Sequence, residues 1–444
     1  MELLLTAASV ILLASGSYFT WRFRAFFILH PIKTLKLLPR DGVKQMLLSL
    51  GGTVGVGNIA GVSVALALGG SGAVFWMWVG ALVAMALKYA EITLGMLFRG
   101  GAPIYIKKAL GPFFAGLFAV LLIIDAVVMG GMIQSSAVSE AMHTALGLSH
   151  LISGVLLSLL AAAVFFFNVD LFRLSSVVVP IMSVGYVVCA LAVIFVNAHE
   201  IPRVLQNIFT NAFDTDAVTG GTLGFMFTPA MRQGIVKGLF SNEAGCGTAP
   251  MAHAASKEKV PAKQGLFGAV EVFVDTILMC TLTAFAILLT DSEAVGGVTA
   301  CIDAFKTVFG ADAPLMLAVA VLLFAFSAIV SFGYYGTECL EYFGAVENGK
   351  NAFLLVYCIS VFVGATLAPS LAWSIADAVI CIMLIVNTSA VVVSRKKILT
   401  AHAELYSHIG KYSHKASKTR SFSYGSVKNA SPMSDSEINR GSML

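Results

Sequence analysis

Residues 51–61 read GGTVGVGNIAG, and residues 238–250 read GLFSNEAGCGTAP. Each stretch places several glycines and one asparagine inside an otherwise apolar run. Because each glycine costs a helix about 1 kcal/mol relative to alanine, the stretches predict either interrupted helices or close helix contacts through small residues. An interruption at membrane depth is tolerated only where the backbone lines a cavity.

The rest of the chain is typical of a membrane protein. Of its 444 residues, 58% are hydrophobic and only 12% are charged, and the mean hydropathy is +0.88. Soluble domains carry about 25% charged residues, so the composition excludes a soluble enzyme and a disordered chain. Apolar runs of about 20 residues predict helices, since the strands of a membrane barrel have about 10 alternating residues.

We therefore predict an all-α polytopic membrane protein with about eleven transmembrane helices. Their expected positions are 3–21, 50–70, 73–97, 112–140, 150–167, 174–197, 233–255, 264–290, 312–337, 352–368 and 371–394. Together they form a predicted transporter domain over residues 1–394.

The two glycine-rich stretches open the second and the seventh predicted helix. If residues 1–23 form an extra helix, the two stretches begin two halves of five helices each, 45–197 and 232–394. Because five is an odd number, the two halves cross the membrane in opposite orientations. Interrupted segments at corresponding positions are the best sequence indication of the binding site of an inverted-repeat transporter. Residues 395–444 begin with basic residues and lack a periodic apolar face, so we expect a disordered tail.

Basic residues predict the orientation. They follow the first helix, at Arg22, Arg24, Lys33, Lys36, Arg40 and Lys44. By the positive-inside rule the N-terminus faces outward and the C-terminus is cytoplasmic. We expect the chain to contact the lipid bilayer and no nucleic acid, because the basic tail has no folded basic surface for nucleic acid.

Three motifs resemble those of the alanine or glycine:cation symporters, the sodium:alanine symporter family. They are GTVGVGNIAGVSVALALGGSGAVFWMWVGALVAMALKYAE (52–91), GLFSNEAGCGTAPMAHAAS (238–256) and QGLFGAVEVFVDTILMCTLTA (264–284). The resemblance implies a leucine-transporter-like 5+5 inverted repeat with an extra N-terminal helix and two broken helices. It also implies sodium-coupled uptake of small neutral amino acids, alanine or glycine, across a bacterial cytoplasmic membrane. The sequence leaves the stereoisomer open, so D-alanine stays among the candidate substrates.

The broken segments supply candidate substrate-binding residues, since freed amides and carbonyls can hold a carboxylate and an ammonium group. Gln134 lies in mid-helix, where it either bonds a neighbouring helix or contacts substrate; the resemblance favours substrate. Trp373 either closes the pocket or anchors a helix at the interface. The full set is Gly55, Val56, Gly57, Asn58, Gln134, Phe240, Ser241, Asn242, Gly245 and Trp373.

Sodium is the expected coupling ion, and no cofactor is expected. A hard cation needs several oxygen ligands, which backbone carbonyls near Gly52 and Thr53 and hydroxyls of Ser327 and Ser331 would supply. The family tends to have two adjacent threonines where this chain has Ser327-Ala328. A proton-coupled carrier therefore stays open as an alternative.

Ionisable residues inside the predicted spans are functional candidates by default. Glu243 lies inside the second break, where we expect a structural or gating role through hydrogen bonds to the loosened backbone. Direct cation binding and protonation-linked gating are its alternatives. The others are Glu91, Asp125, Glu140, Glu271, Asp275 and Asp377.

Other functions are less compatible with the sequence. A permease for another amino acid, such as glutamine, remains the main alternative. A channel would need rings of like groups, and an enzyme would need a motif such as HExxH, GxSxG or the phosphate-binding GxxxxGK followed by serine or threonine. None of these occurs in full, since residues 344–351 read GAVENGKN and lack the final hydroxyl residue. We expect no enzymatic activity. The sequence leaves the oligomeric state open, with a monomer as the expectation.

Overall fold

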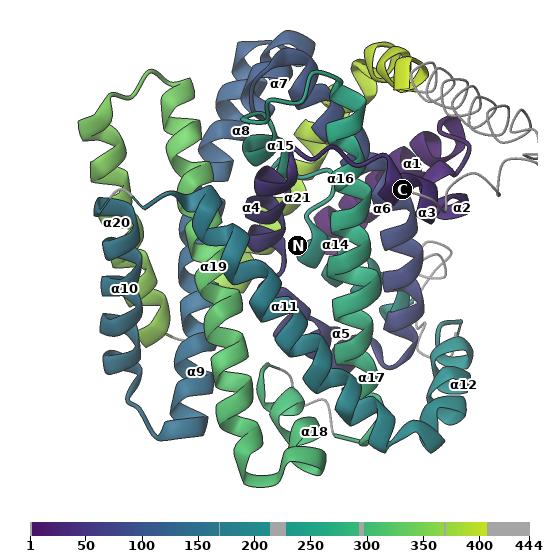
Figure 1. The fold of residues 1–444 in the computed structure, drawn as a ribbon, viewed down its shortest axis with the longest axis vertical. Helices are drawn as coiled ribbons and strands as arrows, with labels where there is room; N and C mark the ends of the chain where they lie inside the picture. Colours follow the sequence, from purple (N-terminus) through teal and green to yellow (C-terminus); the bar gives the residue numbers. More distant parts are fainter. Residues whose placement is uncertain (1, 168, 214–227, 293–296, 368–369, 406–444) are drawn as a thin grey trace, which may run out of the picture.

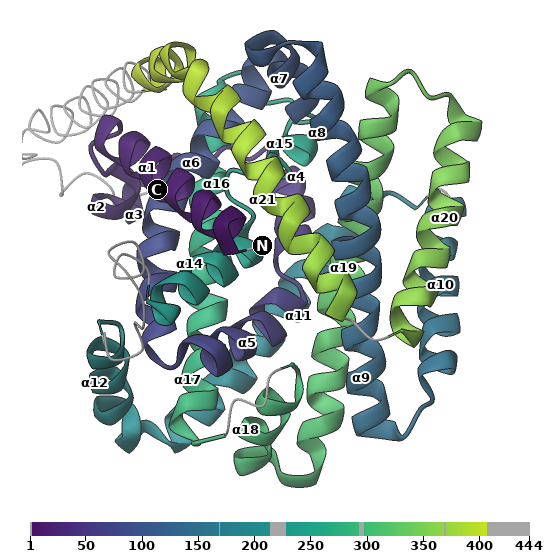
Figure 2. The same cartoon turned by 180° about the vertical axis from the view of Figure 1, so that it is seen from behind.

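The computed structural model describes residues 2–167, 169–213, 228–292, 297–367 and 370–405, and within these ranges it contains helices and no strands (Figures 1 and 2). The predicted all-helical architecture is therefore confirmed. Most of the predicted tail, residues 406–444, lies outside the described residues.

Eight helices in this part of the chain are long and apolar enough to cross a membrane, and nine if a bent pair counts as one span. They are α1 (Glu2–Arg22), α6 (Gly72–Phe98), α8–α9 (Pro112–Asp125 and Gln134–Leu146), α11 (Leu171–Val196), α16–α17 (Pro261–Val272 and Thr281–Leu289), α18–α19 (Thr299–Phe309 and Ala313–Tyr342), α20 (Glu347–Thr366) and α21 (Ser370–Val393). The bent pair is α4 (Val43–Thr53) with α5 (Ala60–Gly69).

Two of the predicted spans are helical but shorter than a full crossing. The segment expected at 150–167 is α10 (His150–Phe166), with 17 residues. The segment expected at 233–255 is divided into α14 (Pro229–Asn242) and α15 (Ala249–His253). Short helices complete the fold: α2 (Phe26–Leu29), α3 (Pro31–Lys36), α7 (Ala102–Leu110) and α12 (Ile201–Asn211).

The first break follows the glycine-rich sequence. α4 and α5 are bent by 57°, and a single 3-10 turn, Val56–Asn58, lies between them. The side-chain Oδ1 of Asn58 accepts a hydrogen bond from the backbone N–H of Gly55 at 3.0 Å. The asparagine thus satisfies a backbone donor that the interrupted helix leaves without its usual partner.

The second break is built on left-handed backbone. Glu243, Gly245 and Gly247 have φ angles of 52°, 82° and 79°. Glycine adopts this region without steric cost, whereas Glu243 does so against a penalty of roughly 1–2 kcal/mol. α14 therefore ends at Asn242, and α15 begins with Pro250 in its first turn, where proline is tolerated.

The packing brings the two breaks together in the middle of the molecule. α6 packs against α14, α16 and α1, while α19 packs against α4 and α9. In Figure 1, α7 and α15 lie at one end of the bundle, here called the α7 end, and α12 and α18 lie at the other, the α12 end. The predicted extra helix α1 lies beside α21 on the face shown in Figure 2.

Two long helices contain a π-helical segment. Residues Ala126–Ile133 connect α8 to α9 and end next to Gln134, while residues Phe273–Cys280 connect α16 to α17 and contain Asp275. Such segments widen a helix locally and are frequent at functional sites. The second segment presents Asp275 to the breaks, and the first ends directly before Gln134, which contacts the first break from α9.

Candidate binding site at the two helix breaks

Asn58 joins the two broken helices. Its side-chain Nδ2 lies 3.0 Å from the hydroxyl of Ser241 and 2.8 Å from Oδ1 of Asp275. The hydroxyl of Ser241 in turn donates to Oδ2 of Asp275 at 2.8 Å. All three residues are at most 1% exposed. A buried polar junction therefore connects the first break, the end of α14 and the π-helical segment after α16.

Gln134 contacts the first break from the opposite side. Its Oε1 accepts a hydrogen bond from the backbone N–H of Val56 at 3.2 Å. A Cβ atom at Gly55 would lie 3.1 Å from the same oxygen, so a larger residue there would push the Gln134 side chain back by a few tenths of an ångström. Gly55, Val56, Asn58, Gln134 and Ser241 are thus brought together, and Gln134 makes the interhelical hydrogen bond that was one of its two expected roles.

Asn242 holds the second break through all of its polar groups. Its Nδ2 donates to the hydroxyl of Thr276 at 3.0 Å, and its Oδ1 accepts from the backbone N–H of Ala244 at 3.0 Å. Its carbonyl accepts a hydrogen bond from the ammonium group of Lys88 at 2.8 Å. The side chain therefore shapes the break itself, whereas the sequence predicted a substrate contact.

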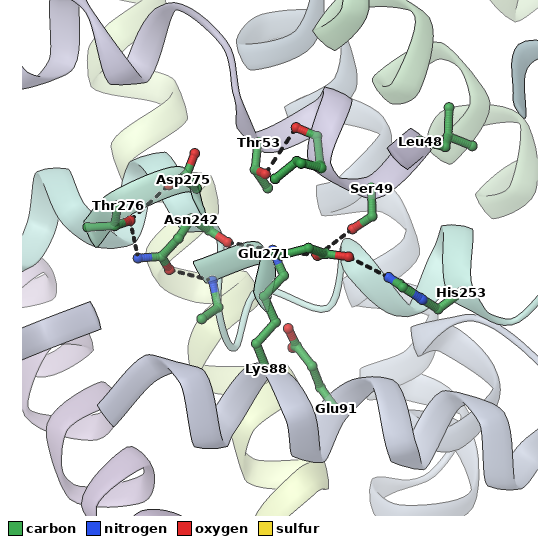
Figure 3. Close-up of polar contacts among 12 residues, drawn as sticks. Leu48, Ser49, Thr53, Lys88, Glu91, Asn242, His253, Glu271, Asp275 and Thr276 are labelled. Atoms are coloured by element: carbon green, nitrogen blue, oxygen red, sulfur yellow. Dashed lines mark hydrogen bonds and ion pairs between the residues drawn. The ribbon is translucent and has the colours of Figure 1, made fainter. Parts of the chain in front are cut away.

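Lys88 belongs to a buried ionic network (Figure 3). Its ammonium group lies 3.2 Å from the carboxylate of Glu271, and both side chains are completely buried. Glu271 also accepts a hydrogen bond from Ser49 at 2.9 Å and lies 2.6 Å from Nε2 of His253. The network ties α4, α6, α15 and α16 together at the base of the second break.

An aromatic pair and an ion pair bridge α14 and α21 toward the α12 end. The ring centroids of Phe240 and Trp373 are 5.0 Å apart. The ammonium group of Lys237 lies 5.0 Å and 5.1 Å from these two rings and 3.5 Å from Oδ1 of Asp377. Since the backbone of α14 packs mainly against α6 and α5, long side chains form the bridge to α21.

Of the predicted cation ligands, the two serines contact carbonyls of α4 that lie one residue and one turn before Gly52. The hydroxyl of Ser327 on α19 donates to the carbonyl of Gly51 at 2.8 Å, and the hydroxyl of Ser331 donates to the carbonyl of Leu48 at 2.8 Å. The sequence predicted carbonyls near Gly52 and Thr53 instead. The hydroxyl of Thr53 bonds within its own helix, to the carbonyl of Leu50. Hydroxyl and carbonyl oxygens are the donor set that a hard cation prefers.

In the described part of the chain, Glu243 does not make the backbone contacts expected of it, and the carbonyl of Gly245 faces α21. Within the described residues, neither carboxylate oxygen of Glu243 has a hydrogen-bond partner, so it does not hold the loosened backbone. Glu91 has that role, because its Oε2 accepts from the backbone N–H of Gly247 at 3.1 Å. The carbonyl of Gly245 accepts a hydrogen bond from Asn387 at 2.8 Å, which directs this glycine toward α21.

Sequence reasoning assigned no role in the site to Asp275, Thr276 and Lys88. The available signal was a charged residue inside an apolar run, which marked Asp275 as a candidate without a partner. The π-helical segment that directs Asp275 toward Asn58 has no clear signature in the sequence. The contact between His253 and Glu271 likewise has no signal in the sequence.

Comparison with known proteins gives this geometry a context. Residues 2–420 match the family model described as the sodium:alanine symporter family. The sodium/alanine symporter AgcS of Methanococcus maripaludis is 33% identical over 426 residues, covering 87% of this chain and 93% of its own. GlnT of Bacillus subtilis, named as a probable sodium/glutamine symporter, is 34% identical over 420 residues, covering 88% and 86%.

A solved structure supports the fold independently of close sequence similarity. MhsT in complex with L-phenylalanine superposes with a TM-score of 0.59 at 12% identity, covering 83% of this chain and 98% of its own. This similarity identifies the fold as that of the leucine transporter, as the resemblance implied. The chain is therefore a multi-pass secondary transporter that belongs to the sodium:alanine symporter family.

Proposed function

We propose that this protein couples the inward movement of sodium to the uptake of a small neutral amino acid, alanine or glycine, by alternating access. The observation that carries the proposal is the junction of Asn58, Ser241 and Asp275, where two helix breaks meet inside the membrane domain. Unwound backbone and half-helix ends at such a junction hold substrate and coupling ions in secondary transporters.

The amino-acid backbone would bind at the first break. Gly55, Val56 and Gly57 present backbone there, and Gln134 occupies the amide of Val56. The carboxylate of the substrate would replace Gln134 as the acceptor of this amide. The carboxylate of Asp275, which contacts Asn58 beside the first break, would attract the ammonium group of the substrate. Phe240 and Trp373 would cover the side chain of the substrate. Because both rings are large, they would leave room for a small substrate side chain.

Sodium would bind between α4 and α19. The hydroxyls of Ser327 and Ser331 lie 2.8 Å from the carbonyls of Gly51 and Leu48. A rotation of each hydroxyl would turn its lone pairs toward a cation without moving the backbone. The ion would then tie the first half-helix to α19 and favour the closed conformation.

We infer the orientation from the charges at the two ends. The α7 end carries Arg99, Lys107 and Lys108 and would face the cytoplasm. The N-terminus would then be outside, the described part of the chain would end in the cytoplasm, and the membrane would be the bacterial cytoplasmic membrane. The halves 45–197 and 232–394 would be the two repeats that move against each other.

Uptake into proteoliposomes tests the proposal. Labelled alanine and glycine should accumulate with an inward sodium gradient and not with an equal potassium gradient. Labelled glutamine tests the main alternative, which the name of the relative GlnT favours. Gln134→Ala should weaken alanine uptake at least tenfold, whereas Gln206→Ala on the exposed face of α12 should not. Equal uptake without sodium, or no flux of any of the three, would contradict the proposal.

A further inference from the structure

The buried interior of the described chain contains more acidic groups than basic ones. Five carboxyl side chains are at most 2% exposed: Glu91, Asp125, Glu243, Glu271 and Asp275. In the same region Lys88 is the completely buried ammonium group, and His253 is the completely buried imidazole. Even with both of these charged, at least three carboxyl groups have no basic partner. Isolated buried charges are strongly disfavoured, so such groups bind a cation or a proton.

Hydrogen bonds distinguish the five groups. Glu271 contacts Lys88, His253 and Ser49, and Asp275 accepts from Asn58, Ser241 and Thr276. Glu91 accepts from the N–H of Gly247 and from Asn387. Such donors stabilise an ionised carboxylate. Glu271 and Asp275 are therefore equipped to carry a negative charge in the closed interior, whereas Glu91 is supported at Oε2 alone and its Oε1 is buried without a partner in the described structure.

Glu243 has much less support, since the hydroxyl of Thr248 interacts with its carboxylate but does not make a hydrogen bond of normal geometry. Both of its carboxylate oxygens are buried without a hydrogen-bond partner in the described structure, and so is the hydroxyl of Thr248 in the same break. Its backbone N–H closes the last turn of α14 onto the carbonyl of Leu239 at 2.8 Å, which places Glu243 at the C-terminal end of that helix. The negative end of the helix dipole opposes a further negative charge there.

The charged surroundings of Glu243 do not compensate. The ammonium group of Lys88 interacts with Glu243 but is already bonded to the carbonyl of Asn242 and to Glu271. Oδ1 of Asp125 on α8 has no partner either. The ionisable groups that face Glu243 are Lys88 from α6, Asp125 from α8, Glu271 from α16, Asp275 from the π-helical segment, Tyr335 from α19 and Cys246 from its own loop.

We propose that Glu243 is a proton-binding site: its carboxyl group is neutral in the closed conformation and exchanges its proton with water when the second break opens. In the described part of the chain, no group of three or more histidine, cysteine, aspartate or glutamate side chains is arranged to hold a metal ion, so sodium is the competing ligand that the experiment must exclude. The strained backbone of Glu243, with φ at 52°, is the part of the break that an opening movement would relax.

The consequence for transport rests on the proposed function, whereas the proton site does not. If the break opens toward the α7 end, water reaches Glu243 and the ionised form becomes stable, so that opening and proton release favour each other. Low pH at that end would then slow the opening, and the Glu243→Gln variant, a permanent mimic of the neutral form, would no longer respond to pH.

Infrared spectroscopy of the purified full-length protein tests the proton site directly. We expect an absorption from a protonated carboxyl C=O group near neutral pH, which shifts when glutamate is labelled with ¹³C at its side-chain carboxyl and is lost in Glu243→Gln. The exposed residue Glu347 provides the control, since Glu347→Gln should leave the absorption unchanged. The labelling measurement needs no variant and no substrate, so its result is independent of which amino acid is transported.

Several results would overturn the proposal. The first is the absence of the absorption in wild-type protein at neutral pH. The second is an absorption that appears only after sodium is removed, since sodium would then be the ligand of Glu243. Loss of the absorption in Asp125→Asn or Glu91→Gln, with retention in Glu243→Gln, would place the proton elsewhere. Uptake into proteoliposomes tests the link between the proton on Glu243 and the opening of the break. This link would be excluded if uptake depended on internal pH in the same way for the wild-type protein and for Glu243→Gln.

Discussion

The side-chain amide of Asn58 lies 3.0 Å from the hydroxyl of Ser241, and this contact joins two residues that are 183 positions apart in the chain. Asn58 ends the first helix break, and Ser241 lies in the last turn of α14, directly before the second. A movement of either half-helix must therefore change the contact. This is why we place substrate binding and the change of access at the same point of the fold.

The first prediction concerns the proposed sodium site. Ser327→Ala removes a hydroxyl that lies 2.8 Å from the carbonyl of Gly51. We expect the sodium concentration for half-maximal alanine uptake to rise about tenfold, equivalent to about 1.4 kcal/mol. Ser389→Ala on the exposed side of α21 is the control. An unchanged sodium dependence would exclude Ser327 as a ligand.

The second prediction concerns the bridge between α14 and α21. Lys237→Met removes a cation that contacts two aromatic rings and Asp377. A cation–π contact away from water contributes about 1–2 kcal/mol, so the variant should open toward the α12 end several times more often.

Cys280 reports such opening, since its sulfur lies 3.3 Å from the hydroxyl of Ser241. In a protein with Cys280 as its single cysteine, Lys237→Met should speed modification by a membrane-impermeant thiol reagent, and the charge-swapped pair Lys237→Asp with Asp377→Lys should slow it again. Lys306→Met disrupts an exposed ion pair with Asp303 and should have no effect. Equal rates in all variants would refute the gating role.

The third prediction concerns the buried pair Lys88 and Glu271. Lys88→Met leaves Glu271 with a buried charge and should destabilise the protein by about 3–5 kcal/mol. Replacing both residues, as in Lys88→Met with Glu271→Gln, should recover much of that loss because both charges of the pair are removed together. Thermal unfolding in detergent measures the difference, with exposed Lys257→Met as the control. A double variant as unstable as the single one would show that the charge pairing is not the cause.

The fourth prediction concerns His402, in the helical segment 395–405 beyond α21. Its Nδ1 lies 2.8 Å from the hydroxyl of Tyr89, and burial lowers the pKa of His402 to about 4. The docked segment therefore prefers the neutral imidazole. The contribution of neutral His402 to the stability of the docked segment is fully present above the pKa of an unfolded histidine, about 6.5, and is lost as the pH falls toward about 4.

Protease cleavage after residue 395 should therefore accelerate as the pH falls through this range. His402→Gln should make the cleavage rate less dependent on pH, whereas His199→Gln, at an exposed histidine, should behave like wild type. Cleavage that is independent of pH in the wild-type protein would contradict the link between protonation and docking.

The sequence predicted the architecture because lipid imposes strong rules. Long apolar runs must form helices, and clustered glycines with an asparagine must interrupt them. Both interruptions occur where expected, with Asn58 and Asn242 capping or bracing the loosened backbone. Helix lengths were harder to predict, since α10 and the α14–α15 pair are shorter than the apolar runs that contain them.

The contacts of the site were less predictable, because they depend on helix rotation. A shift of one turn decides whether Ser331 faces the carbonyl of Leu48 or that of Gly52, and the sequence pattern does not fix this shift. The π-helical segment around Asp275 changes which side chains face Asn58. Glu243 was noticed for its position, but only the three-dimensional structure shows that its carboxylate has no partner among the described residues.

The most direct test of the central claim is equilibrium binding of labelled alanine to the purified protein, with and without sodium. We predict binding that is at least tenfold tighter in sodium for the wild-type protein and is weakened at least tenfold in Ser241→Ala, with Ser389→Ala unchanged. Alanine binding of equal strength with and without sodium, or unaltered binding in Ser241→Ala, would contradict a sodium-coupled site at the meeting point of the two breaks.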